Sequence, residues 1–580
     1  MPKQNFSPIK SLCRALAVAG LALLLVHCAP APTSAPPAST QTGAPVKSGG
    51  TVTIALSSEP DTLNPYLASQ RAAAEVHIFV IEGLLSVNEK GEFFPVLATE
   101  VPTKENGGVS ADGLTITYHL KPNVTWSDGA PFTCDDVKFT WEAVVNPKSA
   151  AIATAGYQEI ASVSCPDPLT VVVKYKTFYA AYLVPFWTVL PRHATGDPAE
   201  MTKWAYNRKP IGTGPFKISE WVTGDHITLV RNEHYRGAAQ GKPYLDSVII
   251  RFVPSSEVAL QLLQTGDVTV VGDVSDQDLP QLTKSPNILI GSAPSQRSQR
   301  LVLNLGDPSV DAPNPIDQHH PILADARVRQ AIELAINKQE IVDKLLNGKG
   351  AVGTNDLSLG WARCPTPPSE FNPDKARQLL DDAGWKVGSD GIRVAQGAQF
   401  AKDGTRLHLK MQGPTGDPLR EQVEQILVER WKQVGIEASI ENAPTSALFG
   451  TWDSGGIARH GKFDMLIYTT GLPIVDPQSF IEGYFASWNI PDASNHGAGY
   501  NYSRWINATA DDAIQAAGST ADTAARRDAY CQVMQQVVQE RPLIYLYSRL
   551  AIFAYRSSLQ GWVTNVWKNM GWNAADWTLR

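Results

Sequence analysis

Residues 210–254 read PIGTGPFKISEWVTGDHITLVRNEHYRGAAQGKPYLDSVIIRFVP, and their pattern predicts a turn followed by three short strands. Gly212 and Gly214 stand where the chain must bend. Apolar residues alternate on both sides of 223–225, which predicts an antiparallel hairpin around that turn. Residues 248–253 are apolar on nearly both faces, which is typical of a strand that is covered on both sides.

The order of residues in this stretch carries more information than its periodicity. The succession G-T-G-P-F, W, L-x-R-N-x-x-Y and P-Y-L-D resembles a hallmark of solute-binding protein family 5, the extracellular peptide-type binding proteins of ABC importers. Residues 120–142 (LKPNVTWSDGAPFTCDDVKFTWE) and 325–342 (DARVRQAIELAINKQEIV) resemble two further hallmarks of that family. The resemblance implies an α/β fold like that of periplasmic binding proteins (type II, cluster C), with two large hinged lobes and a smaller inserted domain.

The resemblance extends from residue 50 to about residue 563. Residues 300–304 are expected to form the strand that crosses into the second lobe, and 543–547 and 551–555 the strands that return. Strand–helix–strand succession in the second lobe predicts a mainly parallel sheet there. The predicted parts are a lipoprotein signal peptide (1–28), a disordered tether (29–50), lobe I (51–85 and 206–300, with the return 551–580), an inserted small domain (86–205) and lobe II (301–550).

The beginning of the chain resembles an export signal. Basic residues precede an apolar run at 15–26, which is too short to span a bilayer as a permanent helix. The run ends in LVHC at 25–28, similar to a bacterial lipobox in which Cys28 becomes a diacylated N-terminus, but His27 stands where a small residue is normal. The alternative is an ordinary secretory signal in which Cys28 is incidental. Residues 29–50 cannot bury a core and predict an extended tether, with anchoring by lipid alone.

The composition is that of a globular protein, with 43% hydrophobic residues, 18% charged residues and a net charge of −7. This mildly acidic balance argues against nucleic acid as a partner. Four cysteines lie outside the signal, an even number in an oxidising compartment: Cys134, Cys165, Cys364 and Cys531. The local pair Cys134–Cys165 is the preferred disulfide, and Cys364–Cys531 follows by exclusion. Since none of the four is spaced as Cys-x-x-Cys, metal binding by them is not expected.

Motifs for catalysis or cofactor binding are absent from the sequence. It contains no His-Glu-x-x-His, Gly-x-Ser-x-Gly or Gly-x4-Gly-Lys-Ser/Thr pattern. The triplet Asp453-Ser454-Gly455 is like that of aspartic proteases but occurs once, outside the required strand context. The pair His319-His320 has no third ligand at useful spacing, so a solvated loop is favoured over a metal site. We therefore expect no catalytic residues, no metal and no cofactor, with an extracellular hydrolase as the alternative from another class.

Two stretches are candidates for contact with a ligand. The loop 57–68 (SSEPDTLNPYLA) follows the first strand, and in the family a similar loop approaches the ligand, so Glu59 or Tyr66 is a candidate lining residue. The alternative is a purely structural loop rich in Pro and Asn. The second stretch is 463–485 (FDMLIYTTGLPIVDPQSFIEGYF), in which 463–468 predicts a buried strand. Thr469, Thr470 and Gly471 would then lie at the end of the strand where α/β sheets present ligands.

In peptide-binding relatives, the segment that corresponds to 463–485 carries an aspartate that pairs with the α-amine of the peptide. The resemblance places that position on Pro473, which supplies no negative charge for a buried ammonium. Either Asp476 or another acid takes over, or the ligand has no free amine. If Asp476 takes over, replacing it with Ala would weaken the binding of a free-amine peptide. Aromatic residues, dense in this lobe, could stack a ligand or form core: Trp452, Tyr468, Tyr484, Trp488, Tyr500 and Trp505.

These observations predict a lipid-anchored, monomeric, non-enzymatic binding subunit of an ABC importer, outside the cytoplasmic membrane. The expected partners, implied by the resemblance, are a di- or oligopeptide in the cleft between the lobes and a membrane permease. An oligosaccharide or opine is the alternative ligand. The ligand-contacting residues predicted are Glu59, Tyr66, Trp452, Tyr468, Thr470, Gly471, Asp476 and Trp488.

Overall fold

The computed structural model describes residues 48–580 except 69–70, 153, 155, 273, 276–277, 472–474, 496, 566 and 568–569. The predicted signal, Cys28, most of the tether and Pro473 lie outside the described residues. The described residues belong to one compact unit, Lys47–Arg580. No helix in this part of the chain has the length and apolarity that a membrane crossing requires.

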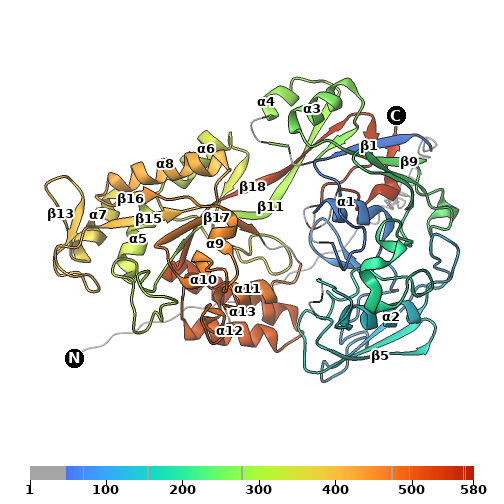
Figure 1. The fold of residues 1–580 in the computed structure, drawn as a ribbon, viewed down its shortest axis with the longest axis horizontal. Helices are drawn as coiled ribbons and strands as arrows, with labels where there is room; N and C mark the ends of the chain where they lie inside the picture. Colours follow the sequence, from blue (N-terminus) through green and yellow to red (C-terminus); the bar gives the residue numbers. More distant parts are fainter. Residues whose placement is uncertain are drawn as a thin grey trace, which may run out of the picture. The chain divides into compact units, whose positions relative to one another are not determined.

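One large sheet organises the described chain (Figure 1). Its strands follow the order β16 (Glu437–Ile440), β15 (His408–Gln412), β17 (Met465–Gly471), β11 (Ile288–Leu303), β18 (Leu543–Arg556), β10 (Val270–Val271), β1 (Thr51–Leu56), β9 (Ser247–Phe252), β8 (His226–Arg231) and β7 (Phe216–Val222), and β12 (Gly350–Val352) also pairs with β18.

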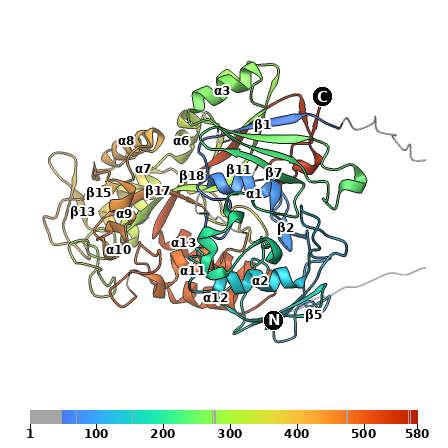
Figure 2. The same ribbon diagram turned by 45° about the vertical axis from the view of Figure 1, so that its right-hand side comes forward.

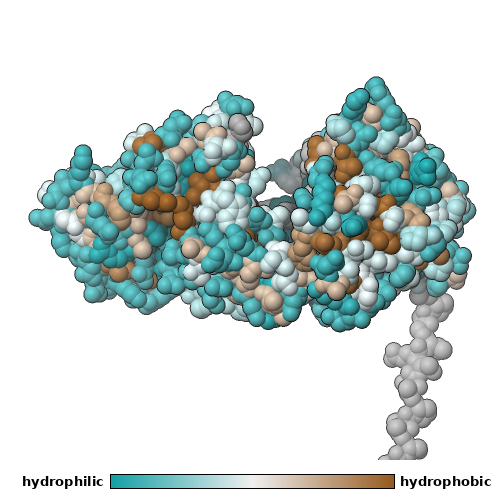
Figure 3. Space-filling view, turned by 90° about the horizontal axis from the view of Figure 1, so that it is seen from below, coloured by the Kyte–Doolittle hydropathy of each residue, from teal (hydrophilic) through white to brown (hydrophobic). Residues whose placement is uncertain are grey.

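Strands β11 and β18 each serve both halves of the sheet. Residues 288–294 of β11 pair antiparallel with 550–556 of β18, and 298–302 pair with 543–548, with a bulge between the two sets. The two returning strands predicted at 543–547 and 551–555 are therefore one continuous strand. We use the names lobe I for residues 48–294 and 550–580, and lobe II for residues 298–548. In the space-filling view the surface is hollowed between the two lobes (Figure 3).

Lobe I contains the stretch 210–254, which folds into β7, β8 and β9 as predicted. The helix α1 (Arg71–Val80) packs on β7, α3 (Ser256–Thr265) packs on β10, and α4 (Leu279–Leu282) follows β10. Gly212 is required for a reason that the pattern did not show. A Cβ on Gly212 would lie 1.8 Å from the carbonyl oxygen of Val80, so this glycine permits close approach of two backbone segments.

The region between β2 and β7 adds a small three-stranded sheet to lobe I. It comprises β2 (Leu85–Val87), β3 (Phe93–Pro95), β4 (Thr115–His119), α2 (Cys134–Val145), β5 (Ile160–Asp167) and β6 (Thr170–Tyr175), with the strand order β4-β6-β5. Cys134 on α2 is disulfide-bonded to Cys165 on β5, with Cα atoms 5.7 Å apart. The core of this region is continuous with that of lobe I, since Val52 and Val171 belong to one hydrophobic cluster.

Lobe II is built on both faces of its part of the sheet. Alternate residues of β11 and β17 enter two different cores, Leu301 and Ile467 on one face and Val302 and Leu466 on the other. The first core also takes α5 (Ala326–Leu334), α6 (Lys338–Leu345), α7 (Pro373–Asp382) and α8 (Pro418–Lys432). The second takes α9 (Thr445–Phe449), α10 (Ile457–His460), α11 (Gln478–Phe485), α12 (Ala508–Gly518) and α13 (Thr523–Glu540), which lie together in both views (Figure 2).

The sheet of lobe II is mixed, where a mainly parallel one was predicted. β15 is parallel to β16 and β17, whereas β17, β11 and β18 are antiparallel. The reason is that β11 and β18 are shared with lobe I and run the length of both halves. Cys364, in the loop after β12, is disulfide-bonded to Cys531 on α13, with Cα atoms 5.3 Å apart. The chain ends in lobe I with β19 (Leu559–Gln560) and β20 (Thr578–Leu579).

Candidate functional site

A cavity of about 330 Å³ lies in lobe I at one edge of the large sheet. It is bounded by residues that follow β1, β9 and β10, whose carboxyl ends meet because β1 is parallel to both neighbours. Ligands of α/β proteins bind outside such ends, in pockets of roughly 300–1,000 Å³. The polar residues that line the cavity are Ser57, Ser58, Arg71, Glu75, Ser256, Ser275 and Asp278.

Three segments of the chain form the walls of this cavity. Ser255 caps α3 by accepting a hydrogen bond from a backbone N–H of its first turn, at 3.3 Å. Gly272, after β10, comes so close to Met570 that a Cβ would lie 2.8 Å from the sulfur. Arg71 and Glu75 form an ion pair at 3.1 Å on α1, and Met570 N donates to Glu75 Oε2 at 3.0 Å. The C-terminal return of the chain is thereby joined to α1.

The two residues predicted from the loop 57–68 are engaged in packing. Glu59 Oε1 accepts a hydrogen bond from Trp221 Nε1 at 2.7 Å, and its Oε2 accepts from Gly224 N at 2.8 Å, so this carboxylate ties the loop to the β7–β8 turn. Tyr66 is fully buried, and its hydroxyl donates to Thr188 O at 2.7 Å. Burial raises the pKa of Tyr66 to about 12. From this loop it is Ser57 and Ser58 that line the cavity.

In lobe II the predicted residues of β17 stand at the end of that strand. Thr470 Oγ1 and Tyr484 OH are 3.3 Å apart, and Thr469 Oγ1 donates to Gln299 Oε1 at 2.5 Å. Tyr468 is buried, with its ring 4.9 Å from that of Phe449. Gly471 is the last residue of the strand and is half-buried.

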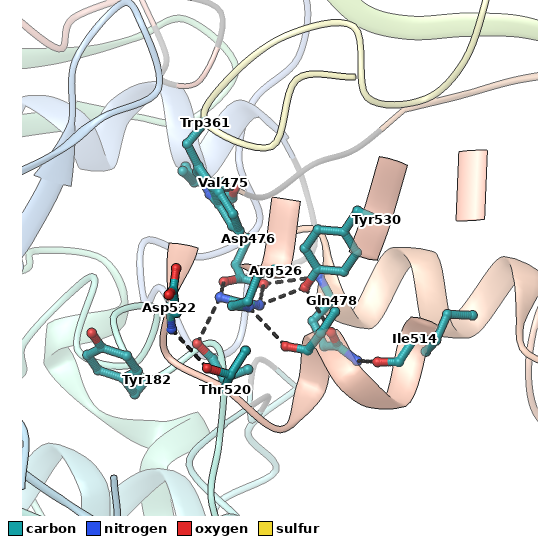
Figure 4. Close-up of polar contacts among 12 residues, drawn as sticks. Tyr182, Trp361, Val475, Asp476, Gln478, Ile514, Thr520, Asp522, Arg526 and Tyr530 are labelled. Carbon is teal, nitrogen blue, oxygen red and sulfur yellow. Dashed lines mark hydrogen bonds and ion pairs between the residues drawn. The ribbon is translucent and has the colours of Figure 1, made fainter. Parts of the chain in front are cut away.

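Asp476 is paired inside the protein (Figure 4). Its two carboxylate oxygens accept hydrogen bonds from Arg526 Nη1 and Nη2 at 2.7 and 2.8 Å, and both residues are 5% exposed. Oδ1 also accepts from Gln478 N at 3.0 Å, at the start of α11. Burial lowers the pKa of the Arg526 guanidinium, but the hydrogen bonds and charge of Asp476 outweigh this effect and raise that pKa. The negative charge that was predicted to meet a ligand amine is therefore already balanced by an arginine.

The predicted aromatic residues divide between packing and surface. Trp452 stacks on His460 with ring centroids 4.1 Å apart, whereas Trp488 is 42% exposed and donates from Nε1 to Glu482 Oε1 at 3.2 Å. Tyr484 stacks on Tyr500 at 5.3 Å. Ligand contact by these residues stays a prediction.

Comparison with known proteins places this geometry in a family. The model of the bacterial extracellular solute-binding proteins, family 5 (Middle), matches residues 92–492, which is more than half of the chain. The chain belongs to this family. The oligopeptide-binding protein AppA of Bacillus subtilis is 27% identical over 576 residues, covering 96% of this chain and 97% of AppA.

Solved structures of family relatives share the fold. The structure of AppA in complex with a nonapeptide superposes with a TM-score of 0.67 at 26% identity, over 92% of this chain and 100% of that chain. NikZ from Campylobacter jejuni, in complex with Ni(L-His), superposes with a TM-score of 0.70 at 26% identity, over 91% of this chain and 99% of that chain. The predicted fold class is therefore confirmed.

In this family 5 protein, sequence reasoning missed a buried arginine at the crossing between the lobes. Arg300 on β11 is fully buried, forms an ion pair with Asp356, and lies 5.6 Å from the ring centroid of Tyr484. Tyr545 OH donates to the other oxygen of Asp356 at 2.7 Å. Arg300 Nε and Nη1 have no hydrogen-bond partner among the described residues. A charged residue directly before the apolar run Leu301-Val302-Leu303 was the one signal in the sequence.

The prediction that His319 and His320 lie in a solvated loop is wrong for His320, which is buried. This side chain is 1% exposed, lies with Nε2 3.1 Å from Asp464 Oδ1, and accepts hydrogen bonds at Nδ1 from Ile322 N and Leu323 N. His320 therefore joins the loop after β11 to Asp464, the residue before β17. The spacing of residues along the chain does not predict this contact. Within the described residues no group of three His, Cys, Asp or Glu side chains is placed to hold a metal ion.

Proposed function

We propose that this family 5 solute-binding protein captures oligopeptides between its lobes and delivers them unaltered to the permease of an ABC importer. The observation that carries the proposal is the match with AppA over 97% of its length, because AppA is named as an oligopeptide-binding protein. A nonapeptide is bound in the structure of that relative. The cavity at the carboxyl ends of β1, β9 and β10 is lined by residues of lobe I and supports a ligand site on that lobe, since ligands of α/β proteins bind at such an edge.

The peptide backbone is the part of the ligand that the protein would recognise. Asp476 already shares its charge with Arg526, so a free α-amine has no unbalanced partner at that position. Main-chain recognition needs hydroxyl groups and backbone donors and acceptors instead. Ser57 and Ser58 in lobe I and Thr470 in lobe II are hydroxyl groups at the carboxyl ends of strands. Such a site would accept peptides of varied side chains.

The protein would act as a monomer outside the cytoplasmic membrane, held by a lipid on Cys28. The residues 29–50 would then give the lobes freedom to meet the permease. Binding and release, without a chemical step, are sufficient for this role.

Native mass spectrometry of the purified protein, followed by calorimetry with what it releases, tests the proposal. We expect additional masses of peptides that leave intact on mild activation, and thermal stabilisation by the same peptides without turnover. A refolded sample stripped of ligand is the control. Bound oligosaccharide or opine masses would contradict the peptide assignment, and a chemically altered ligand would contradict a binding role altogether.

A further inference from the structure

Arg526 connects lobe II to lobe I. It lies near the start of α13, and its Nη1 donates to the carbonyl oxygen of Ala180 at 3.1 Å. Ala180 belongs to the segment after β6, and the neighbouring Tyr182 is part of the core of lobe I. Both ends of this hydrogen bond are 5% exposed, so the contact is made away from solvent. It joins two parts of the chain that are 346 positions apart.

The guanidinium of Arg526 is oriented entirely by lobe II. Nε donates to Ala517 O at 3.1 Å, Nη2 donates to Tyr530 OH at 2.7 Å, and both Nη atoms bind Asp476 (Figure 4). The ring of Trp361 lies over the guanidinium, 5.1 Å from its central carbon. A guanidinium held in this way has little orientational freedom left, so its hydrogen bond to Ala180 costs little further side-chain conformational entropy.

A second contact between the lobes adjoins the first. Gly360, next to Trp361, approaches the indole of Trp567 so closely that a Cβ on the glycine would lie 2.7 Å from the ring. Gly91 in lobe I meets the same indole, at 2.8 Å for its Cβ. Trp567 belongs to lobe I, and its backbone N–H donates to Asn565 Oδ1 at 2.9 Å. The indole therefore lies between a glycine of each lobe.

The same network reaches the segment that follows β17. Trp361 Nε1 donates to Val475 O at 2.9 Å, and Asp476 is the next residue. Val475 and Asp476, just before α11, are thus tied to the residues that orient Arg526. The lobes are also joined by β11 and β18, which carry a bulge at 294–298 where they pass from one lobe to the other.

We infer that Arg526, oriented by Asp476 and Trp361, is a positioning residue that holds the two lobes in the closed state. Opening at the β11–β18 crossing would break the hydrogen bond to Ala180 and the contact of Trp567 with Gly360. Closing would restore both without rearranging lobe II, because its side chains already hold the guanidinium. The closed fraction scales the apparent affinity for any ligand gripped between the lobes. The effect on ligand kinetics rests on the proposed function, whereas the effect on closure does not.

Two arginine variants separate closure from stability. Arg526→Lys keeps a cation beside Asp476 but cannot span Asp476, Tyr530 and Ala180 together. The matched control is Arg393→Lys. Arg393 is 2% exposed and pairs with Asp381 at 2.7 Å, and it donates to Trp385 O at 2.6 Å, all within lobe II. Each variant loses a buried guanidinium and some of its hydrogen bonds, so each is expected to lower the melting temperature.

Small-angle X-ray scattering of the ligand-free protein is the primary measurement. We expect Arg526→Lys to raise the ratio of open to closed molecules about tenfold and so to enlarge the radius of gyration. Arg393→Lys is expected to leave both quantities unchanged. Trp567→Ala, which removes the indole beside Gly360, is expected to act in the same direction and covers the case in which Arg526→Lys fails to fold. Unchanged scattering for the Arg526 and Trp567 variants, or equal changes in the Arg393 control, would overturn the inference.

A kinetic measurement separates this inference from the proposed function. With a library of nonapeptides with free termini as the probe, Arg526→Lys is expected to release bound peptide about tenfold faster, and Arg393→Lys within twofold of the native rate. If no nonapeptide binds to the native protein, the proposed peptide function is wrong, while the scattering result still decides on closure. The inference that Arg526 holds the lobes closed is contradicted if the Arg526→Lys protein releases peptide at the native rate and also gives the native scattering curve.

Discussion

At the scale of single residues, two buried charges of lobe II are each paired with an opposite charge inside the protein. Asp476 binds Arg526, and Arg300 binds Asp356. A carboxylate that already meets a guanidinium in this way has lost the imbalance that would attract a ligand ammonium. The sequence shows Asp476 next to a strand end but not the arginine fifty positions later that meets it.

Asp476→Ala is therefore expected to lower the free energy of unfolding. Removal of one partner of a buried pair leaves the guanidinium uncompensated, at a cost of about 3–5 kcal/mol. Urea denaturation measures the change. Asp381→Ala is the control, because Asp381 is half exposed beside Arg393 and its loss should cost less. A stable Asp476→Ala protein with strongly weakened peptide binding would instead support direct contact with the ligand.

His77 gives the folded protein a defined sensitivity to acid. The side chain is buried on α1, and burial lowers its pKa from 6.5 to about 4. The unfolded chain therefore takes up a proton before the folded one does, so stability is complete above about pH 6.5 and is lost as the pH falls towards 4, by roughly 3 kcal/mol. We expect His77→Leu to flatten the decline of the urea midpoint between these pH values. His319→Leu, on an exposed side chain, is the control, and an equal slope in the two variants would contradict the assignment.

At the scale of elements, the hairpin of β7 and β8 and the entry before it show two different uses of glycine. Gly212 lies against the backbone of Val80 at the end of α1, whereas Gly224 occupies the turn with φ +77° and open space around its Cβ position. The first glycine is needed for packing between elements and the second for backbone conformation. Both positions read simply as turn signals along the chain.

Gly212→Ala is expected to be far more damaging than Gly224→Ala. A methyl group at Gly212 would collide with a carbonyl of α1 and push the helix off the strands, at a cost of about 3 kcal/mol or more. In Gly224→Ala only the left-handed backbone is penalised, by about 1 kcal/mol. Thermal unfolding of the two variants provides the comparison. Similar melting temperatures would show that α1 adjusts to the added methyl group.

At the scale of the whole molecule, the lobes share two long strands and touch again at Arg526 and Trp567. The shared strands explain why the large sheet is mixed, and the second set of contacts explains how closure can be stabilised at a distance from the strands. The proposed function also requires that the protein stay near a membrane permease. The expected means is the lipid on Cys28.

Cys28→Ala is expected to release the protein from the membrane. Without the thiol no diacyl group can be attached, and no helix in the described part of the chain can cross the bilayer in its place. Fractionation of cells that express the variant, together with labelling by radioactive palmitate, measures the effect. Cys13→Ala, inside the same predicted signal, should leave both results unchanged. A Cys28→Ala protein that stays with the membrane would show that Cys28 is incidental.

The family, the strands of 210–254 and the absence of a known catalytic motif were all predictable from the sequence, because they depend on local order and on residues close together in the chain. The residues that line the cavity of lobe I were harder to predict from the sequence. Ser57 and Ser58 line the cavity while Glu59 from the same loop turns to Trp221, and no local rule separates neighbours in an irregular loop. That Asp476 meets Arg526 and that Arg526 reaches Ala180 became visible in the folded protein alone, since contacts between distant segments depend on how the lobes pack.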